Sequence, residues 1–115
     1  MQQQEQTIHV LHSFIMHSDE KSSTLQKQRA RWERVAAIVL TGTRNDLDVS
    51  QRELAARLGW TRNVIANLET GRRSLTLSDF LLIAGALNIN PDILLQRILR
   101  WGQSERSNPK RHSAQ

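Results

Sequence analysis

The stretch that decides the fold is "SQRELAARLGWTRNVIANLETG", which runs from Ser50 to Gly71. Two short helical patterns stand in it, separated by a single glycine, Gly59. Apolar residues recur at helical spacing in both, at Leu54, Ala55 and Leu58 and then at Ile65 and Leu68. In the second pattern Arg62, Asn63 and Asn67 fall outside the apolar stripe. We therefore predict two short helices, the second of which has a polar outer face.

Capping signals mark the ends of both helices. Ser50 is a suitable N-cap, and Glu53 three residues later completes the spacing of a capping box. Gly59 supplies the left-handed residue that ends the first helix. Thr61 is placed to cap the second helix, and Gly71 ends it.

Helical patterns continue on both sides of this pair. A first helix begins near Leu25, with a stripe at Trp32, Val35, Ala36, Val39, Leu40 and Thr43, and "NDLDV" ends it. Thr76 and Asp79 repeat the capping-box spacing before "FLLIAGALN", in which Asn88 is a candidate for a left-handed position. Asn90 then caps a last helix that starts at Pro91 and ends at Trp101. The sequence predicts five helices between residues 25 and 101, no strand, and an all-α domain.

The two ends of the chain differ from this domain. Residues 1–24 form an N-terminal arm, Gln-rich and partly disordered at its start, with an apolar run over 7–18 that fits a strand as well as a helix. "DEKSS" reads as a linker between the arm and the domain at 25–101. Residues 102–115 have almost no apolar content and are expected to be a flexible basic tail.

Charge and composition narrow the class of protein. The net charge is +5, and the stretch 51–73 carries five arginines against two glutamates, while 97–115 has five basic residues against one acidic. Such placement suits a polyanion such as nucleic acid, although a basic solvated face would look the same. The chain has no cysteine, no basic leader before an apolar run and no apolar stretch of membrane-spanning length. We expect a cytoplasmic protein without a membrane segment.

One longer segment, "SQRELAARLGWTRNVIANLETGRRSLTLSDFLLIAGALNINPDIL", resembles the Cro/cI-type helix-turn-helix family, also called the XRE family. The resemblance covers roughly 40–94. Its markers are Ser50, Gln51, Leu54, Ala55, Gly59, Ile65, Leu68, Glu69, Gly71, Phe80, Ile83, Ala84, Leu87, Ile89 and Leu94. It implies a five-helix, lambda-repressor-like domain, here with an extended first helix and an N-terminal apolar arm.

The resemblance also implies roles for individual residues. The second helix of the motif enters the DNA major groove with its N-terminal residues toward base edges. By position, the base-contacting residues are Arg62, Asn63 and Asn67, whose side chains can each bond two groups of one base. The phosphate-contacting positions match Gln51, Thr61, Arg72 and Arg73, and Gln51 also braces the start of the second helix. In the family an arginine matching Arg44 pairs with the glutamate matching Glu69, so we expect that ion pair here.

The helix "FLLIAGAL" is apolar on nearly every side, which predicts that something covers it. The arm at 7–16, the extended first helix and a second subunit are the candidates. A homodimer fits best, because helix-turn-helix proteins of this kind bind paired half-sites. We expect the interface on the last helix, with the arm contributing, at Leu95, Ile98, Leu99 and Trp101.

The function implied is that of a sequence-specific, dimeric transcriptional regulator on a pseudo-palindromic double-stranded DNA operator, with repression of the phage, plasmid or mobile-element type. Two alternatives remain. One is the antitoxin of a toxin–antitoxin system, which binds a toxin and regulates its own operon; the other is a protein-interaction module that has lost DNA binding. We expect no enzyme activity and no cofactor. His9, His12 and His17 stand without cysteines or suitable carboxylates, so no metal site is predicted.

Overall fold

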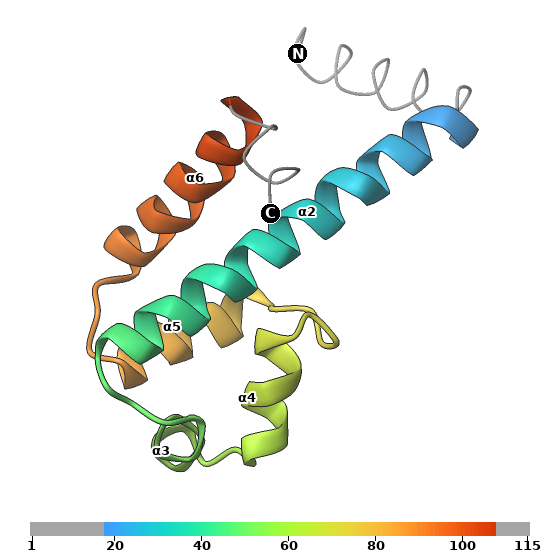
Figure 1. The fold of residues 1–115 in the computed structure, drawn as a ribbon. Helices are drawn as coiled ribbons and strands as arrows, with labels where there is room; N and C mark the ends of the chain where they lie inside the picture. The colour runs from blue at the N-terminus through green and yellow to red at the C-terminus, as the bar shows by residue number, and fades with distance from the viewer. Residues whose placement is uncertain (1–17, 108–115) are drawn as a thin grey trace, which may run out of the picture. The chain divides into compact units, whose positions relative to one another are not determined.

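The computed structural model describes residues 18–107, and the side chains of 23–105 (Figure 1). Its helices are α2 (Ser18–Asp46), α3 (Gln51–Leu58), α4 (Arg62–Glu69), α5 (Leu77–Ala86) and α6 (Pro91–Ser107). No strand occurs among these residues. Over residues 18–107 the predicted all-α fold with five helices is confirmed. The arm at 7–17, with the three histidines named above, lies outside the described residues.

Helix α2 starts earlier than the sequence analysis predicts. It begins at Ser18 rather than near Leu25, so "DEKSS" is helical and no linker separates the arm from the domain. Neither proline nor glycine interrupts 18–41, and the acidic residues Asp19 and Glu20 favour a helix start there. The chain divides within α2 into two compact units, Met1–Arg31 and Trp32–Gln115. All the features below belong to the second unit.

The helix ends follow the capping signals with two exceptions. Gly59 and Asn88 have the predicted left-handed backbone, with φ of 70° and 59°. Thr76 and Asp79 form a complete capping box. At Ser50 the box is half formed: Ser50 Oγ accepts a hydrogen bond from the Glu53 amide at 3.0 Å, but within 18–107 no bond returns from the Glu53 side chain. Thr61 precedes α4 without making any side-chain capping bond.

One hydrophobic core holds the helices of the second unit together. Ile65 is 1% exposed and Leu68 is 4% exposed, so α4 is fixed along its inner face. Ala55 of α3 is small enough for α4 to pack closely against α3. The other buried apolar residues are Val35, Ala37, Val39, Leu40, Val49, Leu54, Phe80, Ile83, Ala84, Leu87, Leu94 and Ile98.

Helix α6 continues past Trp101, where the sequence analysis ends it, and reaches Ser107. The cause is a contact between distant parts of the chain, because Gly102 is buried against the ring of Trp32. A Cβ at residue 102 would lie 2.5 Å from Cζ3 of Trp32, so only glycine fits without a shift. Residues 102–107 are thus part of a packed helix rather than of a flexible tail.

No single helix in 18–107 is both long enough and apolar enough to cross a membrane. The helices α5 and α6 meet the length and composition test only when counted together, and the chain bends by 116° between them.

Candidate DNA-binding site

The outer face of α4 carries the polar row that the sequence analysis singles out. Arg62 and Asn63 are exposed, and Asn67, one helical turn later, is partly exposed. Because Ile65 and Leu68 occupy the inner face, the polar side chains leave the helix on the side away from the core. The arrangement therefore offers one guanidinium and two carboxamide groups along a short, rigid helix.

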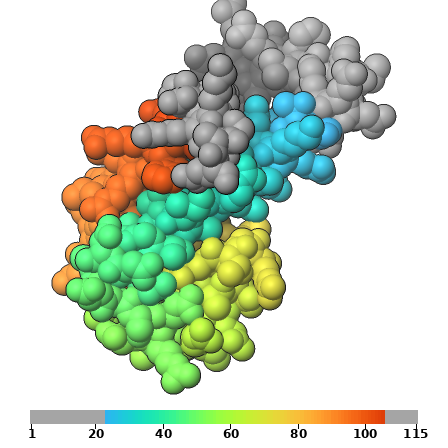
Figure 2. All heavy atoms as spheres, viewed as in Figure 1, coloured from blue at the N-terminus to red at the C-terminus, as the bar shows by residue number. Residues whose placement is uncertain are grey.

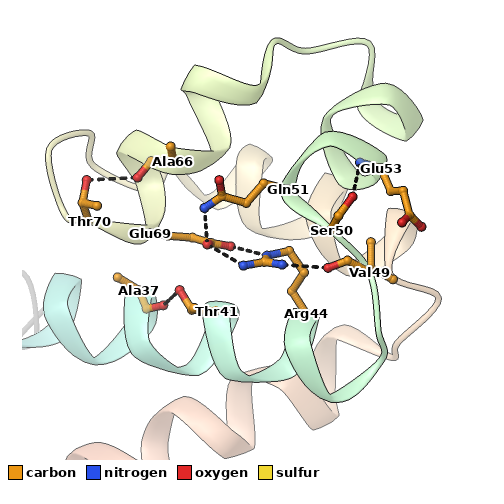
Figure 3. A network of polar contacts seen from close by, with 10 residues as sticks. All are labelled: Ala37, Thr41, Arg44, Val49, Ser50, Gln51, Glu53, Ala66, Glu69 and Thr70. Carbon is orange, nitrogen blue, oxygen red and sulfur yellow. Dashed lines mark hydrogen bonds and ion pairs between the residues drawn. The ribbon is translucent and has the colours of Figure 1, made fainter.

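A buried ion pair fastens the end of α4 to α2 (Figure 3). Arg44 Nε donates to Glu69 Oε2 at 2.6 Å, and Arg44 Nη2 donates to Glu69 Oε1 at 2.9 Å. A third bond runs from Arg44 Nη1 to the Val49 carbonyl oxygen at 2.7 Å. The structure thus contains the Arg44–Glu69 pair that the resemblance implies. The bidentate geometry fixes both the position and the orientation of α4.

The environment of Arg44 keeps its charge. The hydrogen bond to Glu69 raises the pKa of the guanidinium above its ordinary value, burial acts in the opposite direction, and the charge of Glu69 adds to the increase. A cation whose pKa is raised on folding stabilises the fold at every pH below the unfolded value. The arginine therefore stays charged throughout the pH range in which proteins are normally studied.

Gln51 differs from the expectation. Its Nε2 donates to Glu69 Oε1 at 2.9 Å, so the side chain braces the last residue of α4 and not the start of that helix. Figure 3 shows Gln51 and Arg44 reaching Glu69 from different elements. The carboxylate of Glu69 therefore links α2, α3 and α4 through hydrogen bonds. The second hydrogen of the Gln51 amide is not used in this network, which leaves a donor at the start of α3.

The three other phosphate-contact candidates lie at the two ends of α4. Thr61, Arg72 and Arg73 are exposed. After α4 the chain turns at Gly71, whose φ is 77°, and the Arg73 amide donates back to the Asn67 carbonyl at 3.1 Å. Both ends of α4 therefore carry exposed side chains that can donate hydrogen bonds.

The loop after α4 has a tether that sequence reasoning missed. Ser74 Oγ donates to Glu33 Oε1 at 3.0 Å, across a separation of 41 residues. A bond between residues so far apart leaves no local pattern in the sequence. A second long-range bond, from Arg57 Nη1 to the Ala86 carbonyl at 2.9 Å, caps the end of α5 and was also not predicted.

The four expected interface residues on α6 do not share one surface. Ile98 is only 7% exposed and packs in the core, so it holds α6 on the domain and is not available for contact. Leu95, Leu99 and Trp101 are exposed. At roughly 100° per residue, Leu95 and Leu99 lie on one side of the buried stripe and Trp101 on the other. Leu77, Leu81 and Leu82 of α5 also stay exposed in this chain, so the domain itself does not cover this side of the helix.

Comparisons with known proteins find a family match for part of the chain. Residues 43–94 match the helix-turn-helix family HTH_3. Among proteins with curated descriptions, none has a matching sequence.

Solved structures of two regulators have a similar fold. A single-residue variant of the restriction–modification controller protein C.Esp1396I superposes with a TM-score of 0.59 at 20% identity, over 61% of this chain and 93% of that chain. The clp gene regulator ClgR from Corynebacterium glutamicum gives a TM-score of 0.64 at 18% identity, over 72% of this chain and 88% of that chain. At such identities the likeness concerns the fold. Together with the family match, this likeness shows that residues 43–94 are similar to the helix-turn-helix domains of the HTH_3 family.

Proposed function

We propose that this protein binds a specific double-stranded DNA sequence by placing α4 in the major groove. The observation that carries the proposal is the division of α4 into two faces. Its inner face is locked by the core and by the Arg44–Glu69 pair, while Arg62, Asn63 and Asn67 stand on the outer face. A helix of this width fits the major groove, and rigid positioning is what base readout needs.

The proposed base contacts follow from the side-chain chemistry. Arg62 can donate two hydrogen bonds to the O6 and N7 acceptors of guanine. Asn63 and Asn67 can each pair with the N6 donor and N7 acceptor of adenine. These two asparagines are one turn apart on α4, so they would address neighbouring base pairs.

Phosphate contacts would set the register of the helix in the groove. Thr61, Arg72 and Arg73 flank α4, and Gln51 opens α3 with one amide hydrogen to spare. Such contacts position a protein without reading sequence, and they make binding depend strongly on salt. The excess of arginine over glutamate in 51–73 supports this assignment.

The proposed unit is a homodimer on a pseudo-palindromic operator, because two copies of α4 related by a two-fold axis read two half-sites. A protein so bound over a promoter excludes polymerase, so we propose repression, of the kind that small phage, plasmid or mobile-element regulators carry out. The structures named above belong to a restriction–modification controller and a clp gene regulator, which supports a role in gene control. A cytoplasmic location follows from the proposed target.

Selection from a random double-stranded DNA library tests the proposal. We expect enrichment of two inverted half-sites that contain guanine and adenine at the positions facing α4. The control is the same selection with Asn63→Ala, which should relax the preference at one position of each half-site and leave the rest. Failure to enrich any sequence, with binding that depends only on salt, would show that the domain does not read DNA and would favour the interaction module.

A further inference from the structure

A groove of about 530 Å³ lies between α2 and α6, outside the proposed DNA-binding site. Figure 2 shows the atoms of α6, in orange, bordering those of α2, in teal. Thr43 Oγ1 accepts a hydrogen bond from Arg97 Nη1 at 3.3 Å, and Gly102 lies against Trp32, so the two helices run antiparallel. Sites for small molecules typically have volumes of about 300–1,000 Å³, so the groove is large enough to hold one.

The apolar part of the groove comes from one side chain on each helix. Ile38 of α2 is 41% exposed and Trp101 of α6 is 46% exposed, and both line the groove. Ile38 lies five residues before Thr43. Trp101 lies four residues after Arg97, so the antiparallel helices bring it to the same stretch of the groove as Ile38. An aromatic or aliphatic body bound there would remove both side chains from water.

Gly42 leaves space in the wall of the groove. It lines the groove from within α2, which continues to Asp46, and a Cβ at this position would meet no described atom within 4 Å. Glycine destabilises a helix interior relative to alanine. No packing among the described residues requires that cost, because nothing stands where the Cβ would be. A molecule bound in the groove would use the space that the glycine leaves.

The charges that line the groove leave one cation without a partner. Arg97 bonds Thr43, one helical turn before Asp46, so Arg97 offsets the charge of the groove's carboxylate. Arg100 also lines the groove and is exposed. Its side chain has no ion pair or hydrogen bond with another residue in 23–105. The guanidinium can therefore donate two parallel hydrogen bonds to a bound carboxylate or sulfonate.

We propose that the groove binds a small organic anion that has one carboxylate or sulfonate group and an apolar body. The body lies between Ile38 and Trp101, beside Gly42, and the anionic group accepts hydrogen bonds from Arg100. A polyanion such as DNA does not fit this surface, because Asp46 would repel it and the apolar wall would stay uncovered.

The site is separate from the other surfaces to which a role is assigned. Helix α4 and its polar row do not line the groove, so the inference goes beyond the proposed function and does not depend on it. Leu95 and Leu99 leave α6 on the opposite side of its buried stripe from Trp101. A subunit contact at those two leucines would leave the groove open.

The first experiment uses two fluorescent probes with the same aromatic body. Anilinonaphthalene sulfonate carries the anionic group, and phenylnaphthylamine lacks it. The sulfonate should bind the full chain saturably, at a single site, and Arg100→Gln should weaken that binding by about tenfold or more, as expected for hydrogen bonds between charged groups. The neutral probe should bind the wild type and Arg100→Gln equally.

The matched control for the first experiment is Arg34→Gln. Arg34 is exposed on α2 and does not line the groove, so this change should leave the binding of both probes as it is in the wild type. Absence of saturable sulfonate binding would overturn the proposal. So would a loss of sulfonate binding that is equal for Arg34→Gln and Arg100→Gln, because the effect would then be one of net charge alone.

The second experiment fills the groove. Gly42→Leu should abolish the binding of both probes and keep helical circular dichroism, because a Cβ there meets nothing within the described chain. Gly85→Leu is the matched control, since this glycine is exposed on α5 and equally unobstructed but lies outside the groove. Probe binding that survives Gly42→Leu would overturn the proposal. Sedimentation of the probe-free proteins is the second readout. A change of oligomeric state with Gly42→Leu alone would show a subunit contact in the groove and would overturn the ligand site.

Discussion

Arg44 and Arg62 are the same residue type in one small domain, but their surroundings differ in every respect. Arg44 is 7% exposed and donates hydrogen bonds to Glu69 and to a backbone carbonyl. Arg62 is exposed at the first position of α4, with no bonding partner among the residues that the structure describes. The first arginine acts on the inner side of the helix-turn-helix and the second stands on its outer side.

The contrast separates residues that hold α4 in place from residues that α4 presents for binding. A buried cation without its carboxylate is expensive, so Arg44 and Glu69 depend on each other. An exposed arginine at a helix N-terminus contributes nothing to the fold and opposes the helix dipole slightly. The fold would not select such a residue at position 62, which is consistent with a role in binding.

The largest effect that the comparison predicts is on stability. Arg44→Ala should lower the free energy of unfolding by about 3–5 kcal/mol, because Glu69 would remain buried without its counterion. That is a large part of the total stability of a small domain. Urea denaturation followed by circular dichroism measures it.

Arg62→Ala is the control for this experiment and should change stability by less than about 0.5 kcal/mol. The double variant Arg44→Ala/Glu69→Ala should be less destabilised than the sum of the single changes, because both charges are then gone. Equal losses for Arg44→Ala and Arg62→Ala would contradict the division into an inner and an outer side.

The next effect is on sequence-specific binding. Arg62→Ala should weaken binding to the selected operator by about 1–3 kcal/mol, the discrimination typical of one bidentate base contact. Binding to unrelated DNA should fall much less. Fluorescence anisotropy titrations at one fixed salt concentration compare the two kinds of DNA, and equal losses on both would show that Arg62 touches only the backbone.

A smaller and less selective effect is expected from Arg72, in the loop after α4. Arg72→Ala should weaken binding to operator and to unrelated DNA alike, and should flatten the dependence of log K on log salt by about 0.9. Titrations between low and moderate salt measure that slope. An unchanged slope would indicate that Arg72 is solubilising charge, which is the simplest alternative for an exposed arginine pair.

The sequence predicts the parts of this molecule that depend on short spacings. The helices α3 to α5, the left-handed Gly59 and Asn88, and the Thr76–Asp79 box are all encoded within a few residues. The Arg44–Glu69 pair spans a longer distance, and only the resemblance to a family with a fixed register made it predictable. The exposed setting of Arg62 and Asn63 followed from the buried setting of Ile65 and Leu68.

What the sequence did not predict depends on contacts between distant segments. The extension of α6 rests on the packing of Gly102 against Trp32, and the loop after α4 is tethered through Ser74 to Glu33. From the sequence alone Ile98 is a candidate for the dimer interface. Only the packing of α6 on the core shows that Ile98 is buried. Composition alone also does not say what covers the exposed side of α5, and that part of the expectation stays a prediction.

The smallest predicted effect concerns two N-cap residues. Ser50 has a role in stability, and Thr61 has a proposed role in DNA binding. Ser50 accepts a bond from the Glu53 amide and so stabilises α3, whereas Thr61 makes no side-chain capping bond to α4. Ser50→Ala should therefore cost about 1 kcal/mol of stability, a typical value for a lost cap. Thr61→Ala should cost much less, about 0.3 kcal/mol, since no cap bond is lost.

If the Thr61 hydroxyl is instead a phosphate donor, Thr61→Ala weakens DNA binding without a matching loss of stability, and Ser50→Ala does the reverse. Thermal melts and anisotropy titrations on the same two variants separate these outcomes, and a Thr61→Ala protein as destabilised as Ser50→Ala would return Thr61 to the role of a cap.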